Sequence, residues 1–278
     1  MNDAFTVELL TPAIGAEIDG LDLSQPIPAP VLGELRSVWL DRKALIFRGQ
    51  RLTPGEHLAF STLFAEIDKY PFLNGIDGYP MIAPILKLPE ERVNFGGMWH
   101  SDTCYLEAPA AGAVLHALEL PPLGGDTLFA NMALAWETLP TDLANQVEGL
   151  RVVCSSAKKG ISKTREARLN ESRDESSPEA FVSVHPVVRT HPESGEKILY
   201  VNEAHAVHFE GQDEAASEPL LQKLYAHQRL PEFQCRIQWS EGAVLMWDNR
   251  STHHYPVNDY HGHRRLLHRI SLKGDVPF

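Results

Sequence analysis

The first third of the chain alternates between helix-like and strand-like patterns of apolar residues. Over residues 31–39 apolar side chains recur every three or four positions, which predicts an amphipathic helix. The uninterrupted apolar run at 44–47 predicts a short buried strand. Thr53 and Glu56 can form a capping box, and Pro54 between them suits the first position of a helix. A second helix is therefore expected to begin at Pro54.

From about Gly112 the pattern changes to short strands separated by proline and glycine clusters. The expected strands are 113–118, 181–189, 198–202, 235–239, 243–247 and 264–272, with helical patterns near 134–147 and 219–228. Many short strands with turn signals favour a sandwich or barrel over a parallel sheet. The chain has no internal repeat and no linker rich in Pro, Gly or Ser. We therefore expect a single domain over 1–278, mainly β with flanking helices and built on a β jelly roll.

The segment 155–180 differs from its surroundings because 11 of its 26 residues are charged and few are large and apolar. One interpretation is an ordinary solvated loop. The other is a mobile active-site lid, since long irregular loops in compact domains are often functional.

Composition narrows the class of protein. A net charge of −12 argues against a nucleic-acid partner or an anionic membrane surface. No apolar run approaches the roughly 18 residues of a membrane span, and Asp3 and Glu8 do not fit a secretory signal. The three cysteines form no C-x-x-C motif. A cytoplasmic protein is expected, and its unusual feature is 13 histidines, five of them between positions 253 and 268.

Two histidine-containing motifs are candidates for metal binding. If residues 99–103 are extended, His100 and Asp102 point to the same face and can share one ion. Alone, this pattern is weak, and a polar pair at the surface or beside a site is the more common reason for it. His253 and His254 are neighbours, so in a strand they point to opposite faces and at most one can join the same site. Two histidines and one carboxylate suit Fe(II) and oxygen chemistry, although a zinc hydrolase could use a similar set.

A third motif lies near the C-terminus. In a strand, Arg265, Leu267, Arg269 and Ser271 share one face. Guanidinium groups that face a barrel interior are costly unless they meet an anion, so both arginines are candidate anion receptors. The alternative is a basic edge strand that discourages aggregation.

Together these motifs resemble those of the TauD/TfdA (taurine dioxygenase-like) family of Fe(II)- and 2-oxoglutarate-dependent dioxygenases, over nearly the whole chain. The matching stretches are IGAEIDGLDL at 14–23, WHSD at 99–102, LPP at 120–122, GGDT at 124–127, HPVVRTHP at 185–192 and WDNR at 247–250. The resemblance implies a double-stranded β-helix core, which is the cupin-like form of the jelly roll. It also implies Fe(II), 2-oxoglutarate as cosubstrate and O2.

The resemblance assigns roles to individual residues. His100 and Asp102 match the paired metal ligands, and the distal ligand is the histidine seven positions after Trp247, which is His254 rather than His253. That assignment leaves His253 as a neighbour of the site or a surface residue.

Further residues match the family's anion contacts. Arg265, eleven residues beyond the distal histidine, and Thr127 match the residues that hold the far carboxylate of 2-oxoglutarate, and Arg269 matches the arginine that holds the substrate's anionic group.

Other positions depart from the taurine enzyme. Tyr70 is retained, but Ile67 and Gly96 replace polar residues and His205 replaces an aromatic one. We interpret these changes as loss of contacts to a small amino-sulfonate, with space opened beside the metal by Gly96. The expected substrate is therefore a small organic anion other than taurine, bound through Arg269, Tyr70, Gly96 and His205.

The predicted function is oxidation, most simply hydroxylation, of a small anionic organic substrate, coupled to decarboxylation of 2-oxoglutarate to succinate and CO2. Alternatives are desaturation or amine oxidation in specialised biosynthesis, zinc-type hydrolysis, and a non-catalytic jelly-roll binding module. The resemblance also makes a homo-oligomer plausible.

Overall fold

The structure is a computed structural model that describes residues 4–94, 96–158 and 180–278. Its helices are α1 (Ala29–Arg42), α2 (Pro54–Thr62), α3 (Met132–Glu137), α4 (Thr141–Val147), α6 (Glu214–Gln228) and the 3-10 helix η1 (Pro231–Phe233). The first eight strands are β1 (Thr6–Leu9), β2 (Ala16–Asp19), β3 (Ala44–Phe47), β4 (Ile67–Asp68), β5 (Ala83–Lys87), β6 (Gly112–Glu119), β7 (Thr127–Asn131) and β8 (Arg151–Ser155). The others are β9 (Val182–Pro186), β10 (Val188–Thr190), β11 (Lys197–Leu199), β12 (Ala206–Phe209), β13 (Gln234–Ile237), β14 (Val244–Asp248), β15 (Thr252–Pro256) and β16 (Arg265–Leu272).

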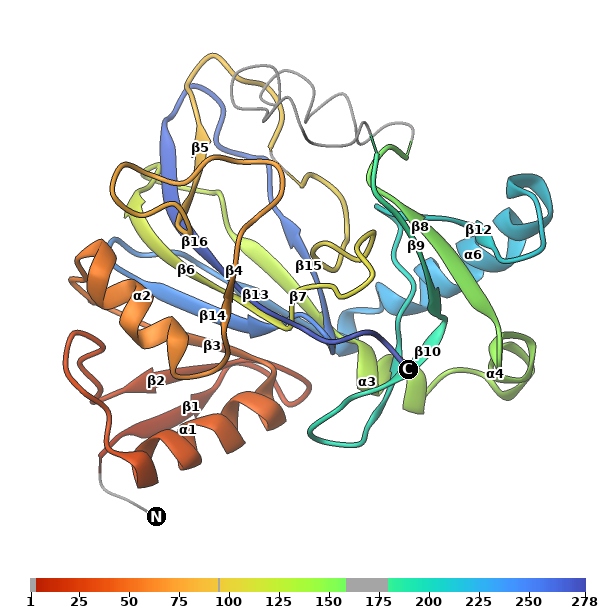
Figure 1. Ribbon diagram of the computed structural model, residues 1–278, viewed down its shortest axis with the longest axis horizontal. Coiled ribbons are helices and arrows are strands. Elements are labelled where there is room, and N and C mark those ends of the chain that lie inside the picture. Colours follow the sequence, from red (N-terminus) through yellow and green to blue (C-terminus); the bar gives the residue numbers. More distant parts are fainter. Residues whose placement is uncertain (1–3, 95, 159–179) are drawn as a thin grey trace.

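Two sheets enclose the central core (Figure 1). The larger sheet has the order β1-β2-β3-β14-β6-β16-β4, with β5 also paired to β16, and the smaller one has the order β13-β7-β15. Apolar side chains from both sheets meet between them, among them Leu115, Phe129, Ile237 and Leu245. Except for β2 with β3, the strand pairs in the described part of the chain are antiparallel. This arrangement confirms the predicted mainly β jelly roll with flanking helices.

Helices α1 and α2 cover the outer face of the larger sheet (Figure 1). Trp39 from α1 and Phe60 from α2 pack there against sheet residues such as Val114. The predicted capping box is present at the start of α2: the Glu56 amide donates to the Thr53 hydroxyl, and the Thr53 amide donates to the Glu56 carboxylate. The local sequence signal therefore sets where this helix begins.

His57 is enclosed between α2 and the larger sheet. Its ring centroid lies 5.8 Å from that of His116 on β6, and His116 is the strand partner of His268 on β16. Burial, followed by the charge of His116, lowers the pKa of His57 from 6.5 to about 3. His57 is therefore neutral in the folded protein throughout the ordinary pH range.

We expect His57 to make the fold sensitive to acid. Between pH 6.5 and about 3 the unfolded chain binds a proton at this residue while the folded chain does not, so stability falls as the pH falls. From pH 7 to pH 5 the loss is about 2 kcal/mol of unfolding free energy. Urea denaturation measures the unfolding free energy at both pH values. In His57→Leu its fall from pH 7 to pH 5 should be smaller than in the wild type by about 2 kcal/mol. An unchanged pH dependence in the variant would show that His57 is not responsible.

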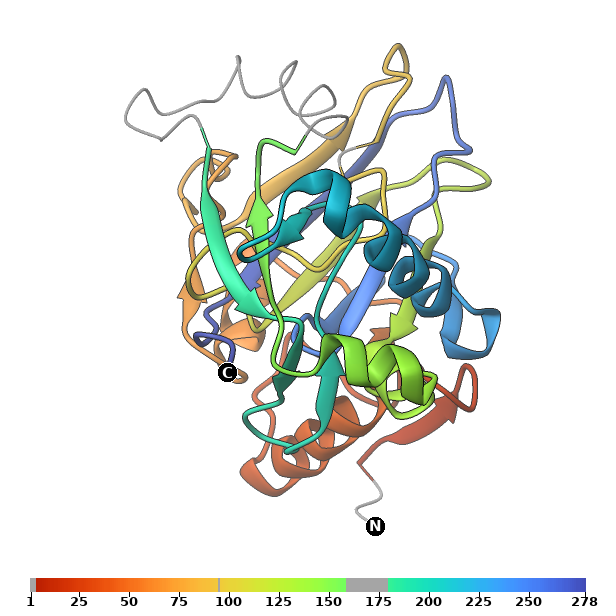
Figure 2. The same ribbon diagram turned by 90° about the vertical axis from the view of Figure 1, so that its right-hand side faces the viewer.

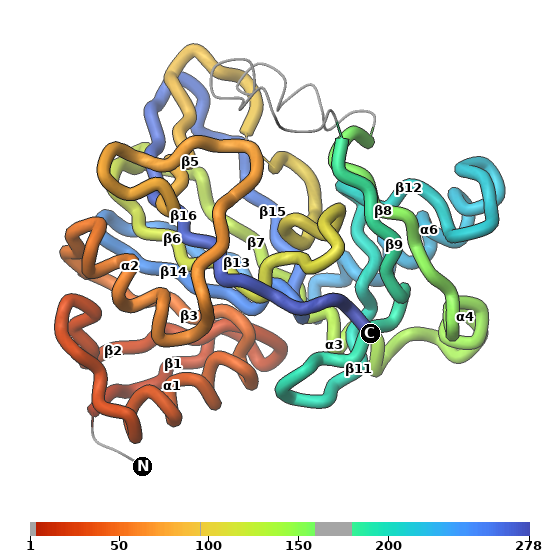
Figure 3. The backbone as a smooth tube through the Cα atoms, in the orientation of Figure 1, coloured from red at the N-terminus to blue at the C-terminus, as the bar shows by residue number. Residues whose placement is uncertain are grey.

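A third layer stands beside the jelly roll, where α6 packs on the sheet β12-β8-β9 (Figures 1 and 2). Val152, Phe209, Leu221 and Leu224 form part of its apolar core. The chain beyond β16 runs to the same side of the molecule, where the Thr190 amide donates to the Phe278 carbonyl (Figure 3). Within the described residues, no helix is long and apolar enough to cross a membrane.

The sequence also predicted a loop or active-site lid over 155–180. Most of that segment, residues 159–179, lies outside the described residues, so the lid stays a prediction.

Two predicted elements are each divided into two in the structure. The helix expected over 134–147 is two helices, because Pro140 lacks an amide hydrogen and disfavours helical backbone in the residue before it. The strand expected over 181–189 becomes β9 and β10, which meet just after Pro186. Between them the Val187 amide donates to the Leu150 carbonyl in register with β8, and the Val187 carbonyl accepts from the Tyr200 amide in register with β11.

Candidate metal centre and active site

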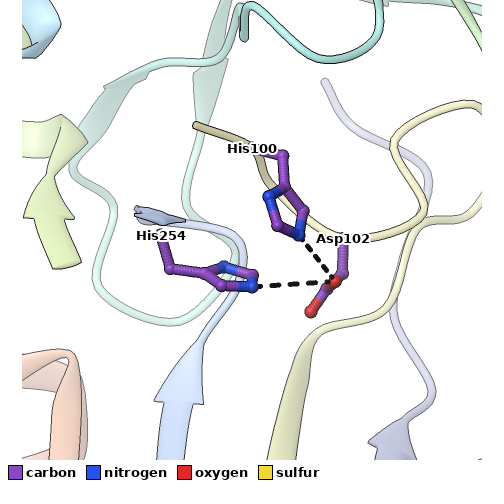
Figure 4. Close-up of side chains that lie close together, drawn as sticks. All are labelled: His100, Asp102 and His254. Carbon is purple, nitrogen blue, oxygen red and sulfur yellow. Dashed lines mark ion pairs between the residues drawn. The ribbon is translucent and has the colours of Figure 1, made fainter. Parts of the chain in front are cut away.

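His100, Asp102 and His254 converge inside the jelly roll (Figure 4). The Oδ1 atom of Asp102 lies 3.6 Å from Nε2 of His100 and 4.0 Å from Nε2 of His254. All three potential ligand atoms are within 4.8 Å of one another, and the three residues are buried. Ligand atoms bound about 2.1 Å from one ion lie at most about 4.2 Å apart, so small side-chain movements suffice to place an ion between them.

The segment that carries His100 and Asp102 is not the extended strand that the sequence suggested. It is irregular, and Thr103 adopts a left-handed φ of 52°. The segment is held against β15 by paired backbone hydrogen bonds between His100 and His254, at 3.1 and 2.8 Å. The two ligands therefore share a face because of contacts made far along the chain rather than because of strand periodicity.

Asn249 also holds the segment that carries His100 and Asp102, through its side chain. Its side-chain oxygen accepts from the Asp102 amide at 2.7 Å, and its side-chain nitrogen donates to the Asp102 carbonyl at 3.0 Å. The neighbouring Asp248 is bound by Arg250 and by His191, so this turn is itself held in place. The WDNR motif at 247–250 and the HPVVRTHP motif at 185–192 therefore help to hold the segment that carries His100 and Asp102. The spacing of the motifs in the sequence did not reveal this structural role.

The protonation states fit a divalent metal. Nδ1 of His100 lies 2.7 Å from the Met98 carbonyl, which can only accept, so Nδ1 donates to that carbonyl and Nε2 is the nitrogen that faces Asp102. Burial lowers the pKa of His254, which keeps that imidazole neutral. Burial raises the pKa of the Asp102 carboxyl, but Arg269, His254 and His100 together outweigh burial and hold the pKa far below its usual range. Two imidazoles and one carboxylate form the donor set that suits Fe(II).

His253 faces the other way, as expected for neighbours in a strand. It is 3% exposed and lies beside Trp99 and Tyr225, on the side of β15 toward α6. Its pKa is lowered to about 3, first by burial and then by the charge of His100. His253 is thus a buried neighbour of the centre rather than a surface residue.

All nine residues predicted for the site line one cavity of about 150 Å³. They are His100, Asp102, His254, Thr127, Arg265, Arg269, Tyr70, Gly96 and His205. Ile67 does not line the cavity, because it lies in β4 and packs with the apolar cluster on the outer face of the larger sheet. Its replacement of a polar residue therefore does not act directly on a ligand in this cavity.

Arg265 and Thr127 lie near each other at one end of the cavity. The guanidinium of Arg265 lies 5.4 Å from the ring of Trp239 and 5.7 Å from that of Tyr260, and Nη2 donates to the Gly125 carbonyl. The Thr127 hydroxyl accepts from Nε1 of Trp239 at 3.0 Å, which leaves its hydrogen free to donate to an anion. Within the described residues no carboxylate forms an ion pair with Arg265. A buried guanidinium without a carboxylate partner is a receptor for an incoming anion.

Arg269 lies beside the metal ligands and faces Asp102. Its guanidinium carbon is 4.6 Å from the ring of Tyr70, a stacking contact that restrains the side chain. His205 lines the same region of the wall, with its ring 6.3 Å from that of His100 and 4.9 Å from that of Tyr105. Aromatic groups and a histidine therefore surround the one guanidinium closest to the metal position.

Gly96 has a role different from the one first suggested. Its φ is +78°, and a Cβ atom there would lie 2.9 Å from Cε1 of His100. Glycine is thus required for the close approach of the backbone to a metal ligand. Gly96 borders the cavity, but the space that its missing side chain leaves is used by the imidazole of His100.

The comparisons with known proteins agree with this geometry. Residues 6–271 match the family model described as "Taurine catabolism dioxygenase TauD, TfdA family". The chain belongs to this family. It is 35% identical to an alkylsulfatase from Acinetobacter baylyi, over 96% of this chain and 84% of that protein. It is 33% identical to an alpha-ketoglutarate-dependent sulfate ester dioxygenase from Pseudomonas putida, over 95% of this chain and 88% of that protein. A solved taurine dioxygenase from Burkholderia xenovorans is 34% identical, with a TM-score of 0.82, over 99% of this chain and 91% of that one.

Membership of the TauD/TfdA family makes this protein a 2-oxoglutarate-dependent dioxygenase, with Fe(II), 2-oxoglutarate and O2 as its cofactor and cosubstrates. The convergence of the two histidines and Asp102 fits that chemistry.

Sequence reasoning missed Trp239 and Tyr260, which flank Arg265, and Asn249, which holds the segment that carries His100 and Asp102. Aromatic residues occur throughout the chain, and only the three-dimensional structure shows which of them contact a buried guanidinium.

Proposed function

We propose that this dioxygenase hydroxylates a small organic sulfate ester at the carbon that carries the ester oxygen. The observation that carries the proposal is the buried guanidinium of Arg269. Arg269 lines the cavity beside Asp102, and its Nε has no hydrogen-bond acceptor among the residues that the structure describes. An anionic head group bound by this guanidinium would place the adjoining carbon next to the metal position. The two sulfate-ester relatives favour sulfate over other anions.

The cavity provides separate places for cosubstrate and substrate. Arg265 and Thr127 would bind the far carboxylate of 2-oxoglutarate, and Arg269 would bind the substrate anion. Tyr70 and His205 would line the path of the organic group. The cavity lining holds two buried guanidiniums against the one carboxylate of Asp102, so its interior is attractive to anions although the whole chain is acidic.

The reaction follows from this arrangement. Iron with 2-oxoglutarate and dioxygen supplies the oxidising power, producing succinate and CO2 and converting one C–H bond of the substrate to C–OH. His100, Asp102 and His254 would hold the metal, while Arg269 would keep the sulfate beside it. In the resulting R–CH(OH)–OSO3⁻ the bond between the carbon and the ester oxygen then breaks, and the hydroxyl proton leaves with the sulfate as hydrogen sulfate. The products are an aldehyde and sulfate.

The test compares hexyl sulfate with hexanesulfonate, which lacks only the ester oxygen, and with taurine and hexanoate. With Fe(II), 2-oxoglutarate and O2, we expect succinate, hexanal and sulfate to form in equal amounts from hexyl sulfate. Its kcat/KM should exceed that for taurine by about 100-fold, the scale of a few kcal/mol of differential transition-state binding. Equal or better turnover of taurine or hexanoate would refute the sulfate-ester assignment.

The predictions of a cytoplasmic location, of a single domain and of a homo-oligomer stay predictions.

A further inference from the structure

The carboxylate of Asp102 is held by Arg269. Nη1 of Arg269 donates to Oδ1 at 3.1 Å, and Nη2 lies 3.1 Å from Oδ2. Both residues are buried, with exposed fractions of 5% for Arg269 and 4% for Asp102. The end of the planar guanidinium thus spans both oxygens of the carboxylate, a geometry that a lysine ammonium cannot reproduce.

This contact sets the rotation of the carboxylate about its own axis. Oδ1 is the oxygen that faces Nε2 of both His100 and His254, while Oδ2 is turned toward Nη2. A metal ion between the two imidazoles would therefore meet one oxygen of Asp102. The other oxygen would remain with the guanidinium.

Arg269 is itself held firmly. It lies in the middle of β16, where it pairs with Leu115 of β6 on one side and with Ala83 of β5 on the other. The ring of Tyr70 covers its guanidinium at 4.6 Å. A side chain on a central strand, covered by an aromatic ring, can fix the orientation of its neighbour.

We propose that Arg269 is a positioning residue of the metal centre, in addition to its proposed contact with the substrate. It would hold Asp102 with only Oδ1 toward the metal, so that the carboxylate provides one ligand atom. A carboxylate free to rotate could bind through both oxygens and take up a further ligand position. Residues that orient metal ligands in this way typically contribute 10- to 100-fold to metal affinity.

Calorimetric titration of the metal-free protein with Co(II), without 2-oxoglutarate or substrate, tests this proposal. We expect Arg269→Gln to weaken Co(II) binding by about 10- to 100-fold. Arg269→Lys should also weaken it, because lysine keeps the charge but lacks the planar fork. The matched control is Arg265→Gln, which removes the other buried guanidinium of the same cavity and should change the affinity less than about 3-fold. Thermal melting of each metal-free variant establishes that it is folded, and Arg269→Lys carries the test if Arg269→Gln does not fold.

Three results would overturn the proposal. Wild-type or tighter Co(II) binding by Arg269→Gln would show that the arginine only competes with or repels the metal. Wild-type binding by Arg269→Lys would show that charge alone is sufficient. An equal loss in Arg265→Gln would show a general electrostatic effect of the cavity. Since no substrate is present, none of these results bears on the sulfate-ester proposal, and failure of that proposal would leave this one standing.

Discussion

Replacing His254 with alanine is expected to reduce 2-oxoglutarate turnover by about 1,000-fold or more, which corresponds to at least about 4 kcal/mol of lost transition-state stabilisation. The same replacement at His253 is expected to leave most of the activity. The two residues are neighbours of the same type and are both buried, but only His254 turns its Nε2 toward Asp102. Succinate formation at saturating Fe(II), together with Co(II) affinity, measures the difference.

The pair of variants is internally controlled, because each removes one buried imidazole from β15. Thermal melting of the metal-free proteins should therefore show comparable losses of stability, while activity and metal affinity separate them. If His253→Ala lost activity and His254→Ala kept it, the side of β15 toward α6 would be the metal-binding side and the assignment of the centre would be wrong.

Replacing Arg265 with alanine is expected to raise the KM for 2-oxoglutarate by about 100-fold. The buried guanidinium would lose its contact with the far carboxylate, and truncating one partner of a buried charge pair costs roughly 2–5 kcal/mol. Metal affinity should change little, because Arg265 does not contact any of the three ligand residues. Steady-state kinetics at varied 2-oxoglutarate measures the effect.

Arg264→Ala is the control for the loss of a charge from the same strand region. Arg264 is exposed and pairs with Glu119 at the surface, so its removal should leave the KM almost unchanged. Similar KM values for wild type and Arg265→Ala would contradict the assignment of this end of the cavity to 2-oxoglutarate.

The elements that could be predicted from the sequence are those set by local interactions. The capping box at Thr53 and Glu56 marks the start of α2, and the apolar run of β3 lies at the predicted residues. Sheet neighbours could not be predicted in the same way, because they join distant segments. β3 pairs with β14, about 200 residues further along the chain, and no local pattern specifies that partner.

The candidate site shows the same division. The family resemblance assigned the distal ligand to His254 rather than His253, and strand alternation placed Arg265 and Arg269 on one face, because both signals are contained in a few residues. The convergence of His100 with Asp102 depends instead on Asn249 and on the backbone pairing with β15. The side chains of His100 and Asp102 do converge, but because of these contacts and not because of an extended strand. Likewise, the need for glycine at position 96 becomes apparent only when the ring of His100 is in place.

The central claim is that these residues bind iron and 2-oxoglutarate in one site. Its most direct test is an anaerobic titration of the metal-free protein with Fe(II) and 2-oxoglutarate, monitored for the visible charge-transfer band of the chelated keto acid. We expect the band in the wild type, and a much weaker band in Asp102→Ala and Arg265→Ala at the same concentrations. A folded wild-type protein that gives no band would contradict the account and would favour a jelly roll that binds ligands without this chemistry.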